Sequence, residues 1–180
     1  MRLRHPHLVF AGVAGLVVIL DQVSKSFARD QLTVGQTIKL VPGVLNLTMT
    51  KNTGAAFGIL SGRQPIFIAV SLVVVAVVLI YLWRQRPTTP LVVIALALVT
   101  GGAVGNLIDR LGPGSVTDFF EFGFFDFPVF NVADSAIFVG VGLLIVWLLT
   151  SPAPLASGGG DGEAQGAEGS DTPDRGTGDS

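Results

Sequence analysis

Four long apolar stretches constrain this chain more strongly than any other feature of its sequence. They run over about residues 7–28, 65–83, 90–111 and 128–150. Each is close to the roughly 20 apolar residues that a helix needs to cross a hydrocarbon core of about 30 Å. Only 13% of the residues are charged and the mean hydropathy is +0.65, whereas a soluble domain carries about 25% charged residues. The sequence therefore predicts an all-α membrane protein with four transmembrane helices.

The first stretch also has features of a secretory signal peptide, because Arg2 and Arg4 precede a short apolar core. A cleavable signal peptide needs a small-x-small site after that core, but the polar segment DQVSK follows Leu20 instead. We therefore interpret this stretch as a retained transmembrane helix.

Basic residues in short loops indicate the orientation of the spans, because such loops stay in the cytoplasm. Arg2 and Arg4 flank the first stretch, and Arg84 and Arg86 lie in the short link between the second and third. The basic residues of the 30–64 connection are spread more thinly. We expect both termini to be cytoplasmic and the segments 30–64 and 112–127 to lie on the outer side.

The two outer segments differ in character. In the first, TIKLV and VLNLTM flank Pro42-Gly43 with β-type alternation, which predicts a small hairpin or sheet on the membrane surface between the first two helices. The second, 112–127, holds six of the twelve Phe of the chain. We expect it to lie in the membrane interface or to contact an apolar substrate.

The last thirty residues, 151–180, differ in composition from the body. They hold one basic residue and six acidic ones, whereas residues 1–150 hold ten and seven, so the acidity of the chain belongs to its end. The segment is rich in Gly, Ser and Pro and has almost no large apolar side chains. We expect a transmembrane domain over 1–150 and a disordered acidic cytoplasmic tail over 151–180.

Cysteine is absent, and His5 and His7 are the only histidines. These counts exclude disulfides, a thiol nucleophile and Cys-ligated metals. They also exclude an H-E-x-x-H zinc site and a Ser-His-Asp triad inside the body. Hydrolytic chemistry would have to come from carboxylates, Ser or Lys, and we expect no metal and no cofactor.

Polar residues within the apolar stretches mark a candidate site, because ionisable groups are costly inside a membrane. They form three groups, each spaced to share one helix face: Asp21 with Lys25, Asn106 with Asp109 and Arg110, and Asn131 with Asp134. Successive spans run in opposite directions, so all three groups reach the outer side. Asp118, in the loop before the last stretch, joins them there.

Most of these charges have a purely structural interpretation. Asp21 pairs with Lys25 in that interpretation, Asp109 pairs with Arg110 or Lys25, and the asparagines bridge helices. The pairs Gly101/Gly105 and Gly54/Gly58 in G-x-x-x-G spacing are likewise typical of close packing.

Asp118 and Asp134 fit that interpretation less well, since no basic residue lies within a helical turn of either. Two close carboxylates in a low dielectric cannot both ionise, so one keeps a proton while the other acts as a base. Such a pair can activate water for attack on a peptide carbonyl and protonate the leaving amine. Glu121 and Asp126 lie in the same loop, and spacing alone does not choose between them and Asp118.

Five short blocks carry most of these residues: DQVSK (21–25), NTGAAFG (52–58), GGAVGNLIDR (101–110), VTDF (116–119) and FNVAD (130–134). Their order and content are similar to the five motif blocks of bacterial lipoprotein signal peptidase, also called signal peptidase II. The resemblance covers about residues 8–150. It implies an aspartic endopeptidase of the bacterial cytoplasmic membrane that acts on diacylglyceryl-modified prolipoproteins and cuts just before the lipidated cysteine.

The resemblance also assigns residues. Asp118 and Asp134 match the catalytic aspartates, whereas Glu121 and Asp126 match no motif position. Further matches support the site or hold substrate: Asp21, Lys25, Asn52, Gly54, Asn106, Asp109, Arg110 and Asn131. The implied partners are prolipoproteins, membrane lipids and globomycin-type peptide inhibitors, with no nucleic acid.

Two other functions remain alternatives at this point. A Ser/Lys protease would use Lys25 with Ser24, Ser26 or Ser115, although neighbours on a helix point about 100° apart. A small transporter or channel would line its path with the buried charges. Against a transporter stand the four spans, the lack of an inverted repeat and the confinement of polar groups to one side.

Overall fold

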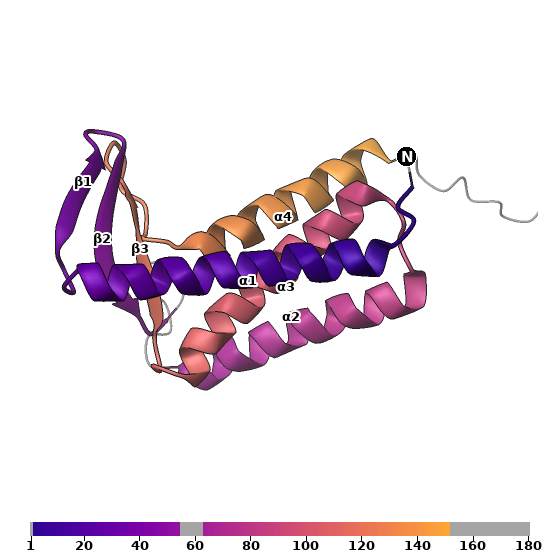
Figure 1. The fold of residues 1–180 in the computed structure, drawn as a ribbon, viewed down its shortest axis with the longest axis horizontal. Helices are drawn as coiled ribbons and strands as arrows, with labels where there is room; N and C mark the ends of the chain where they lie inside the picture. Colours follow the sequence, from indigo (N-terminus) through magenta and orange to yellow (C-terminus); the bar gives the residue numbers. More distant parts are fainter. Residues whose placement is uncertain (1, 55–62, 152–180) are drawn as a thin grey trace, which may run out of the picture.

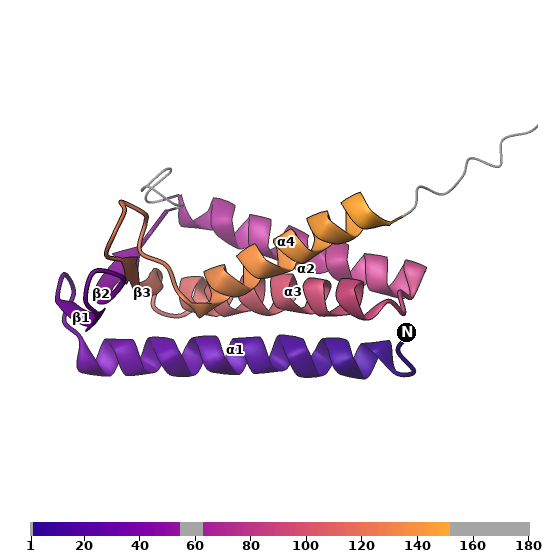
Figure 2. The same ribbon diagram turned by 90° about the horizontal axis from the view of Figure 1, so that it is seen from above.

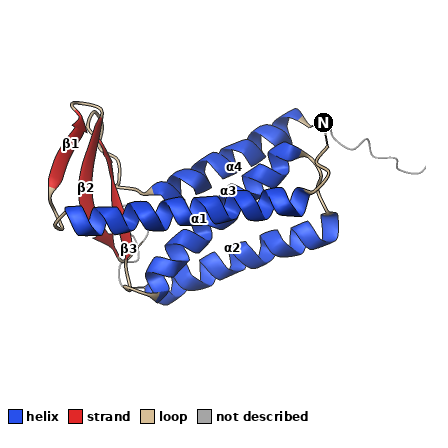
Figure 3. Cartoon of the chain, in the orientation of Figure 1, coloured by secondary structure: helices blue, strands red, loops and turns tan. Residues whose placement is uncertain are grey.

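The computed structural model describes residues 2–54 and 63–151. In these residues it contains four helices and three strands in the order α1 (Pro6–Gln31), β1 (Thr37–Val41), β2 (Leu45–Asn52), α2 (Gln64–Gln85), α3 (Pro90–Leu111), β3 (Val116–Phe122) and α4 (Val132–Thr150). The strands gather at one end of the helix bundle (Figures 1 and 3). Each helix is long and apolar enough to cross a membrane, which confirms the predicted number of spans.

The helices pack around α3. It contacts α1, α2 and α4, and it lies between α1 on one side and α2 and α4 on the other (Figure 2). Small residues make this close packing possible. A Cβ on Gly101 would lie 2.8 Å from the carbonyl oxygen of Ala14 in α1, and one on Gly102 would lie 2.4 Å from that of Ala133 in α4. The packing role expected for the 101–105 glycines is thus confirmed.

α4 begins four residues later than its apolar sequence predicts. Asn131 is its N-cap, and Asn131 and Asp134 form a capping box in which each side chain accepts a hydrogen bond from the other residue's backbone N–H. The residues before it are extended, since Phe130 forms a β-bridge with Phe120. α1 continues three residues beyond the expected end, to Gln31.

The sheet is antiparallel with the order β1-β2-β3. β1 and β2 form the expected hairpin through Pro42-Gly43, where Gly43 has φ 76°, a conformation that favours glycine. β3 is a strand that the sequence pattern does not predict. It joins the sheet from the 112–127 segment and pairs with β2, with Thr50 opposite Asp118.

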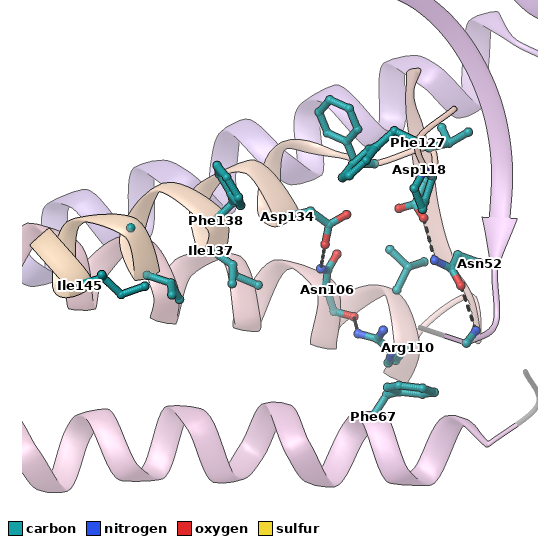
Figure 4. A pocket seen from close by; sticks show the side chains of 17 residues that line it. Asn52, Phe67, Asn106, Arg110, Asp118, Phe127, Asp134, Ile137, Phe138 and Ile145 are labelled. Atoms are coloured by element: carbon teal, nitrogen blue, oxygen red, sulfur yellow. Dashed lines mark hydrogen bonds between the residues drawn. The ribbon is translucent and has the colours of Figure 1, made fainter. Parts of the chain in front are cut away.

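A small apolar core fixes the sheet to the end of α1. Phe119 of β3 and Met49 of β2 are buried against Ala28 and Leu32. Because side chains alternate along a strand, Asp118 points away from this core. It faces the helix bundle's pocket instead (Figure 4).

Candidate active site

Asp118 and Asp134 line one pocket, although they are sixteen positions apart and belong to two different elements. Asp118 comes from the middle of β3 and Asp134 from the first turn of α4 (Figure 4). The pocket has a volume of about 690 Å³, and Asn52, Asn106 and Arg110 also line it. The convergence expected from the alternating direction of the spans therefore brings both carboxylates to one cavity.

Asp118 is 2% exposed and is held by two amide side chains. Its Oδ2 accepts a hydrogen bond of 2.9 Å from Nδ2 of Asn52, and its Oδ1 accepts one of 2.6 Å from Nδ2 of Asn131. Burial raises the pKa of the Asp118 carboxyl to about 7, and the nearby charge of Asp134 adds to the rise; the two amide hydrogen bonds oppose it. Asp118 therefore exchanges its proton near neutral pH.

Asp134 is fixed by the cap of its own helix and by α3. Its Oδ1 accepts a hydrogen bond of 2.7 Å from Nδ2 of Asn106, and its Oδ2 accepts one of 3.2 Å from the backbone N–H of Asn131. The side chain of Asn131 in turn accepts from the backbone N–H of Asp134 at 2.9 Å. Asn131 thus contacts both carboxylates, which fixes their relative position.

A buried ion network lies behind these asparagines. Lys25 Nζ is 2.8 Å from Asp21 Oδ2 and 3.3 Å from Asp109 Oδ2, and it donates a hydrogen bond of 2.9 Å to Asn106. The expected pairing of Asp21 and of Asp109 with Lys25 is therefore confirmed. Asp21 also accepts from the backbone N–H of Ala133 at 3.0 Å, so the network ties α1 to the start of α4.

Arg110 is separate from this network and faces the pocket. Its guanidinium carbon lies 5.2 Å from the ring centre of Phe67, a cation-π contact with α2. Its Nη1 lies 3.4 Å from the backbone oxygen of Asn106. Arg110 makes no ion pair within the described residues, and it lines the pocket that holds both carboxylates.

The rival acids of the 112–127 segment lie elsewhere. Glu121 accepts hydrogen bonds from Asn46 and Thr48 within the sheet. Asp126 is exposed, and neither residue lines the pocket. The geometry favours Asp118 over both.

The rest of the pocket is mostly apolar. Its walls include Phe67 of α2, Phe127 before α4, and Ile137 and Ile145 of α4 (Figure 4). Ile145 is eleven positions beyond Asp134, which corresponds to about 16 Å along a helix. The pocket therefore extends from the polar layer along the membrane-spanning part of α4.

Gly54 also lines the pocket, and its N–H donates a 2.9 Å hydrogen bond to the side chain of Asn52. Gly58 lies outside the described residues, as do Phe57 and the tail after Ser151. No group of three or more potential metal ligands occurs in the part of the chain that the structure describes.

Three residues near the site were not identified from the sequence. Gln22 bonds the Asp21 and Asp109 carboxylates and the Gly105 oxygen. Arg29 contacts Asp109 and Thr117. Gln22 is a polar residue inside an apolar stretch and Thr117 lies in the VTDF block, so both carried a usable signal, whereas nothing in the local sequence distinguishes Arg29.

Comparison with known proteins agrees with this arrangement. The profile of a family described as Signal peptidase (SPase) II matches residues 13–150. The lipoprotein signal peptidase of Brevibacillus brevis is 45% identical over 134 residues, covering 74% of this chain and 90% of the relative. That of Geobacillus kaustophilus is 40% identical over 149 residues, covering 82% and 97%.

Solved structures agree as well. A bacterial membrane enzyme determined by the in meso method at 2.3 Å resolution superposes with a TM-score of 0.80 at 31% identity, covering 89% of this chain and 99% of that one. A second, at 1.9 Å, gives a TM-score of 0.76 at 33% identity.

Fold and site together define a multi-pass membrane enzyme whose polar site lies at one end of a helix bundle. The chain belongs to the signal peptidase II family, proteases that remove signal peptides from lipoproteins.

Proposed function

We propose that this protein is an aspartic endopeptidase in which Asp118 and Asp134 activate a water molecule to cut diacylglyceryl-modified prolipoproteins just before the lipidated cysteine. One observation carries the proposal: two carboxylates, that of the buried Asp118 and that of the half-buried Asp134, line the same pocket and accept hydrogen bonds from a single residue, Asn131. Such an arrangement fixes the two carboxylates relative to each other, so that both can act on one water molecule. Two coupled carboxylates share protons as a pair.

The chemistry follows from one proton shared between two acids. The ionised carboxylate takes a proton from water as the oxygen attacks the scissile carbonyl carbon, giving a tetrahedral intermediate. The protonated carboxyl then gives its proton to the leaving amine, and the C–N bond breaks. The pKa of Asp118, about 7, suits a group that must hold and release a proton at neutral pH.

The polar neighbours have supporting roles in this proposal. Asn52, Asn106 and Asn131 donate hydrogen bonds to the two carboxylates and so keep them oriented. Arg110 lines the pocket and makes no ion pair within the described residues, and we assign it to the substrate backbone or to the developing oxyanion. Asp21, Lys25 and Asp109 hold these groups from behind.

The apolar walls match the chemistry of the substrate. An acyl chain or the apolar core of a signal peptide would lie along α4 between Phe67 and Ile145, with the bond to be cut at the carboxylates. The same pocket is our proposed site for globomycin-type peptide inhibitors, and membrane lipids would surround the exposed apolar faces of the helices.

We further propose that the protein lies in the bacterial cytoplasmic membrane with both termini in the cytoplasm. At one end of the bundle the N–H of Leu3 bonds the oxygen of Thr88, which joins the basic N-terminus to the basic link after α2. The sheet lies at the opposite end (Figure 1), and Asp118 of the sheet lines the pocket. The site would then lie near the outer leaflet, where exported prolipoproteins arrive.

The contacts of Lys25 argue against the Ser/Lys alternative. Its amine is bound by Asp21, Asp109 and Asn106, and the Ser24 hydroxyl donates to the backbone oxygen of Asp21. None of Ser24, Ser26 and Ser115 lines the pocket. A transporter would need polar residues along the whole path, whereas the pocket beyond Asp134 is apolar.

Cleavage by the purified protein tests the proposal. The substrate is a synthetic prolipoprotein peptide with a diacylglyceryl cysteine, and mass spectrometry locates the cut. We expect cleavage just before the modified cysteine, none of the unmodified peptide, and normal turnover by Ser24→Ala, Ser26→Ala and Ser115→Ala. Equal cleavage of the unmodified peptide, or loss of activity in any serine variant, would contradict it.

A further inference from the structure

Thr117, the residue before Asp118, is bound by three different helical elements. Its backbone N–H donates a 3.0 Å hydrogen bond to Oδ2 of Asp109 in α3, and its hydroxyl accepts one of 3.1 Å from Nη1 of Arg29 in α1. Its backbone oxygen contacts Nδ2 of Asn131, the cap of α4, at 3.5 Å. Every polar atom of this buried residue therefore has a partner outside the sheet.

The two backbone contacts lie on the edge of β3 that has no neighbouring strand among the described residues. β2 pairs with the other edge, so the free edge would leave backbone groups without partners. Asp109 and Asn131 bind this edge at Thr117, and Phe130 binds it again at Phe119 and Phe120. The strand that carries Asp118 is thus held by the side chains of Asp109 and Asn131 and by the backbone of Phe130.

Arg29 is well placed to hold this junction. It lies in the last turn of α1, one turn after Lys25, and its Nη1 is 3.7 Å from Oδ1 of Asp109 while Lys25 contacts Oδ2. It is 32% exposed, unlike the fully buried Lys25. Two cations of one helix face therefore fix the two oxygens of Asp109, and only Arg29 continues to the Thr117 hydroxyl.

We propose that Arg29, acting through Thr117 and Asp109, is a positioning residue that holds Asp118 in the geometry needed for peptide-bond cleavage. Side chains alternate along β3, so Arg29 binds the strand on one face while the Asp118 carboxylate acts on the other. The inference rests on the proposed function, because it assigns Arg29 a role only if Asp118 reacts. Arg29 and Thr117 themselves do not touch the pocket.

Loss of this junction should change both rate and pH dependence. If the 117–118 peptide shifts, the hydrogen bonds from Asn52 and Asn131 to Asp118 lengthen. Both bonds lower the pKa of Asp118, so weakening them raises it further. The other charged groups that face Asp118, which are Asp134 of α4, Lys25 of α1 and Arg110 of α3, remain in place.

The test compares Thr117→Val, Arg29→Gln, the double variant and Arg29→Lys, using the full chain in detergent or lipid and the diacylglyceryl peptide. Thr117→Val keeps the β-branched shape and the backbone bond to Asp109 while removing only the hydroxyl. Thr37→Val and Lys39→Gln, both at exposed positions of β1, are matched controls away from the pocket and from β3. The readouts are kcat, KM, the pH profile of kcat/KM and the thermal midpoint.

We expect Thr117→Val and Arg29→Gln each to lower kcat roughly ten-fold with KM little changed, since a misplacement of about 1 Å can cost about 100-fold. The double variant should be no slower than the slower single one, because both remove the same contact. In both single variants and the double variant, the limb of the kcat/KM profile that reports the pKa of Asp118 should move to higher pH. Arg29→Lys should recover part of the rate. Both controls should match the wild type.

Wild-type kcat in the folded single variants would overturn the inference. So would a loss of rate that follows the thermal midpoint without any shift in the pH profile. Asp118→Asn, measured alongside, separates this result from a failure of the proposed function. Turnover by Asp118→Asn would contradict the proposed function, whereas an inactive Asp118→Asn with unaffected Arg29→Gln and Thr117→Val would contradict the positioning role alone.

Discussion

Lys25 Nζ lies 2.9 Å from Oδ1 of Asn106, and this contact determines which way the Asn106 amide faces. An ammonium group has only donors, so the amide oxygen must face Lys25. The NH₂ group is then directed at Asp134, to which it donates a 2.7 Å hydrogen bond. A fully buried cation in α1 thereby orients a carboxylate in α4 without touching it.

Replacing Lys25 should lower the stability of the folded protein. Lys25→Met leaves the buried carboxylates of Asp21 and Asp109 without their shared cation, and breaking a buried pair costs about 3–5 kcal/mol. We expect a large fall in the thermal midpoint of unfolding, measured by tryptophan fluorescence in detergent. Lys39→Met, at an exposed position of β1, is the control and should unfold like the wild type. An unchanged midpoint for Lys25→Met would show that the network adds no stability.

The glycines of α3 should not tolerate alanine. A Cβ on Gly105 would lie 2.5 Å from Oδ2 of Asp21, and one on Gly102 would lie 2.4 Å from the backbone oxygen of Ala133. Overpacking of this kind typically costs about 1–3 kcal/mol. We expect Gly102→Ala and Gly105→Ala to lower both the thermal midpoint and the rate of cleavage.

Gly15→Ala is the matched control for this pair, because nothing lies within 4 Å of a Cβ built there. It should leave stability unchanged or raise it, since alanine favours helix more than glycine does. Midpoints for Gly102→Ala and Gly105→Ala equal to that of Gly15→Ala would argue against close packing of α3 with α1 and α4.

Stability should depend on pH through Asp118. Its pKa is about 7 in the folded protein, above the value of about 3.9 expected in an unfolded chain. Between about pH 4 and 7 the folded state therefore binds more protons at this site, so its contribution to stability is full below pH 4 and is lost as the pH rises through 7. Asp118→Asn cannot titrate, and thermal midpoints measured across this window should fall less steeply than for the wild type. Parallel curves would contradict the raised pKa.

Orientation in the membrane can be tested without any activity. Reporter fusions in the 84–89 link should report a cytoplasmic location, and fusions within 112–127 an external one, because the basic residues gather around the first of these. The reverse result would put both aspartates on the side opposite to exported substrates.

The sequence predicted the helices well because their signal is local. Twenty apolar residues in a row permit few structures other than a span, and all four spans are present. The start of α4 was placed too early because Pro128 to Phe130 are apolar, yet the capping box of Asn131 and Asp134 determines where the helix begins. The expected pair of Asp118 and Asp134 was reached from charge and from the family resemblance together.

Non-local pairing explains what was missed. β3 reads VTDFFEF, which has no clear alternation, because one face packs on α1 and the other faces a largely apolar pocket. Its pairing with β2 joins residues far apart in the sequence, such as Thr50 and Asp118, and the hydrogen bond between the Asn52 and Asp118 side chains spans 66 positions. Arg29 contacts Thr117 across 88 positions of the sequence. No local pattern encodes either contact.

The central claim is that Asp118 and Asp134 act as one unit, and the kcat of the single and double asparagine variants tests it most directly. Asparagine keeps the size of each side chain, and thermal midpoints show that each variant is folded. We predict that Asp118→Asn and Asp134→Asn each lower kcat by at least about 1,000-fold and that the double variant is no slower than either, since residues that act together are not additive. Near wild-type turnover in either folded single variant would contradict the dyad.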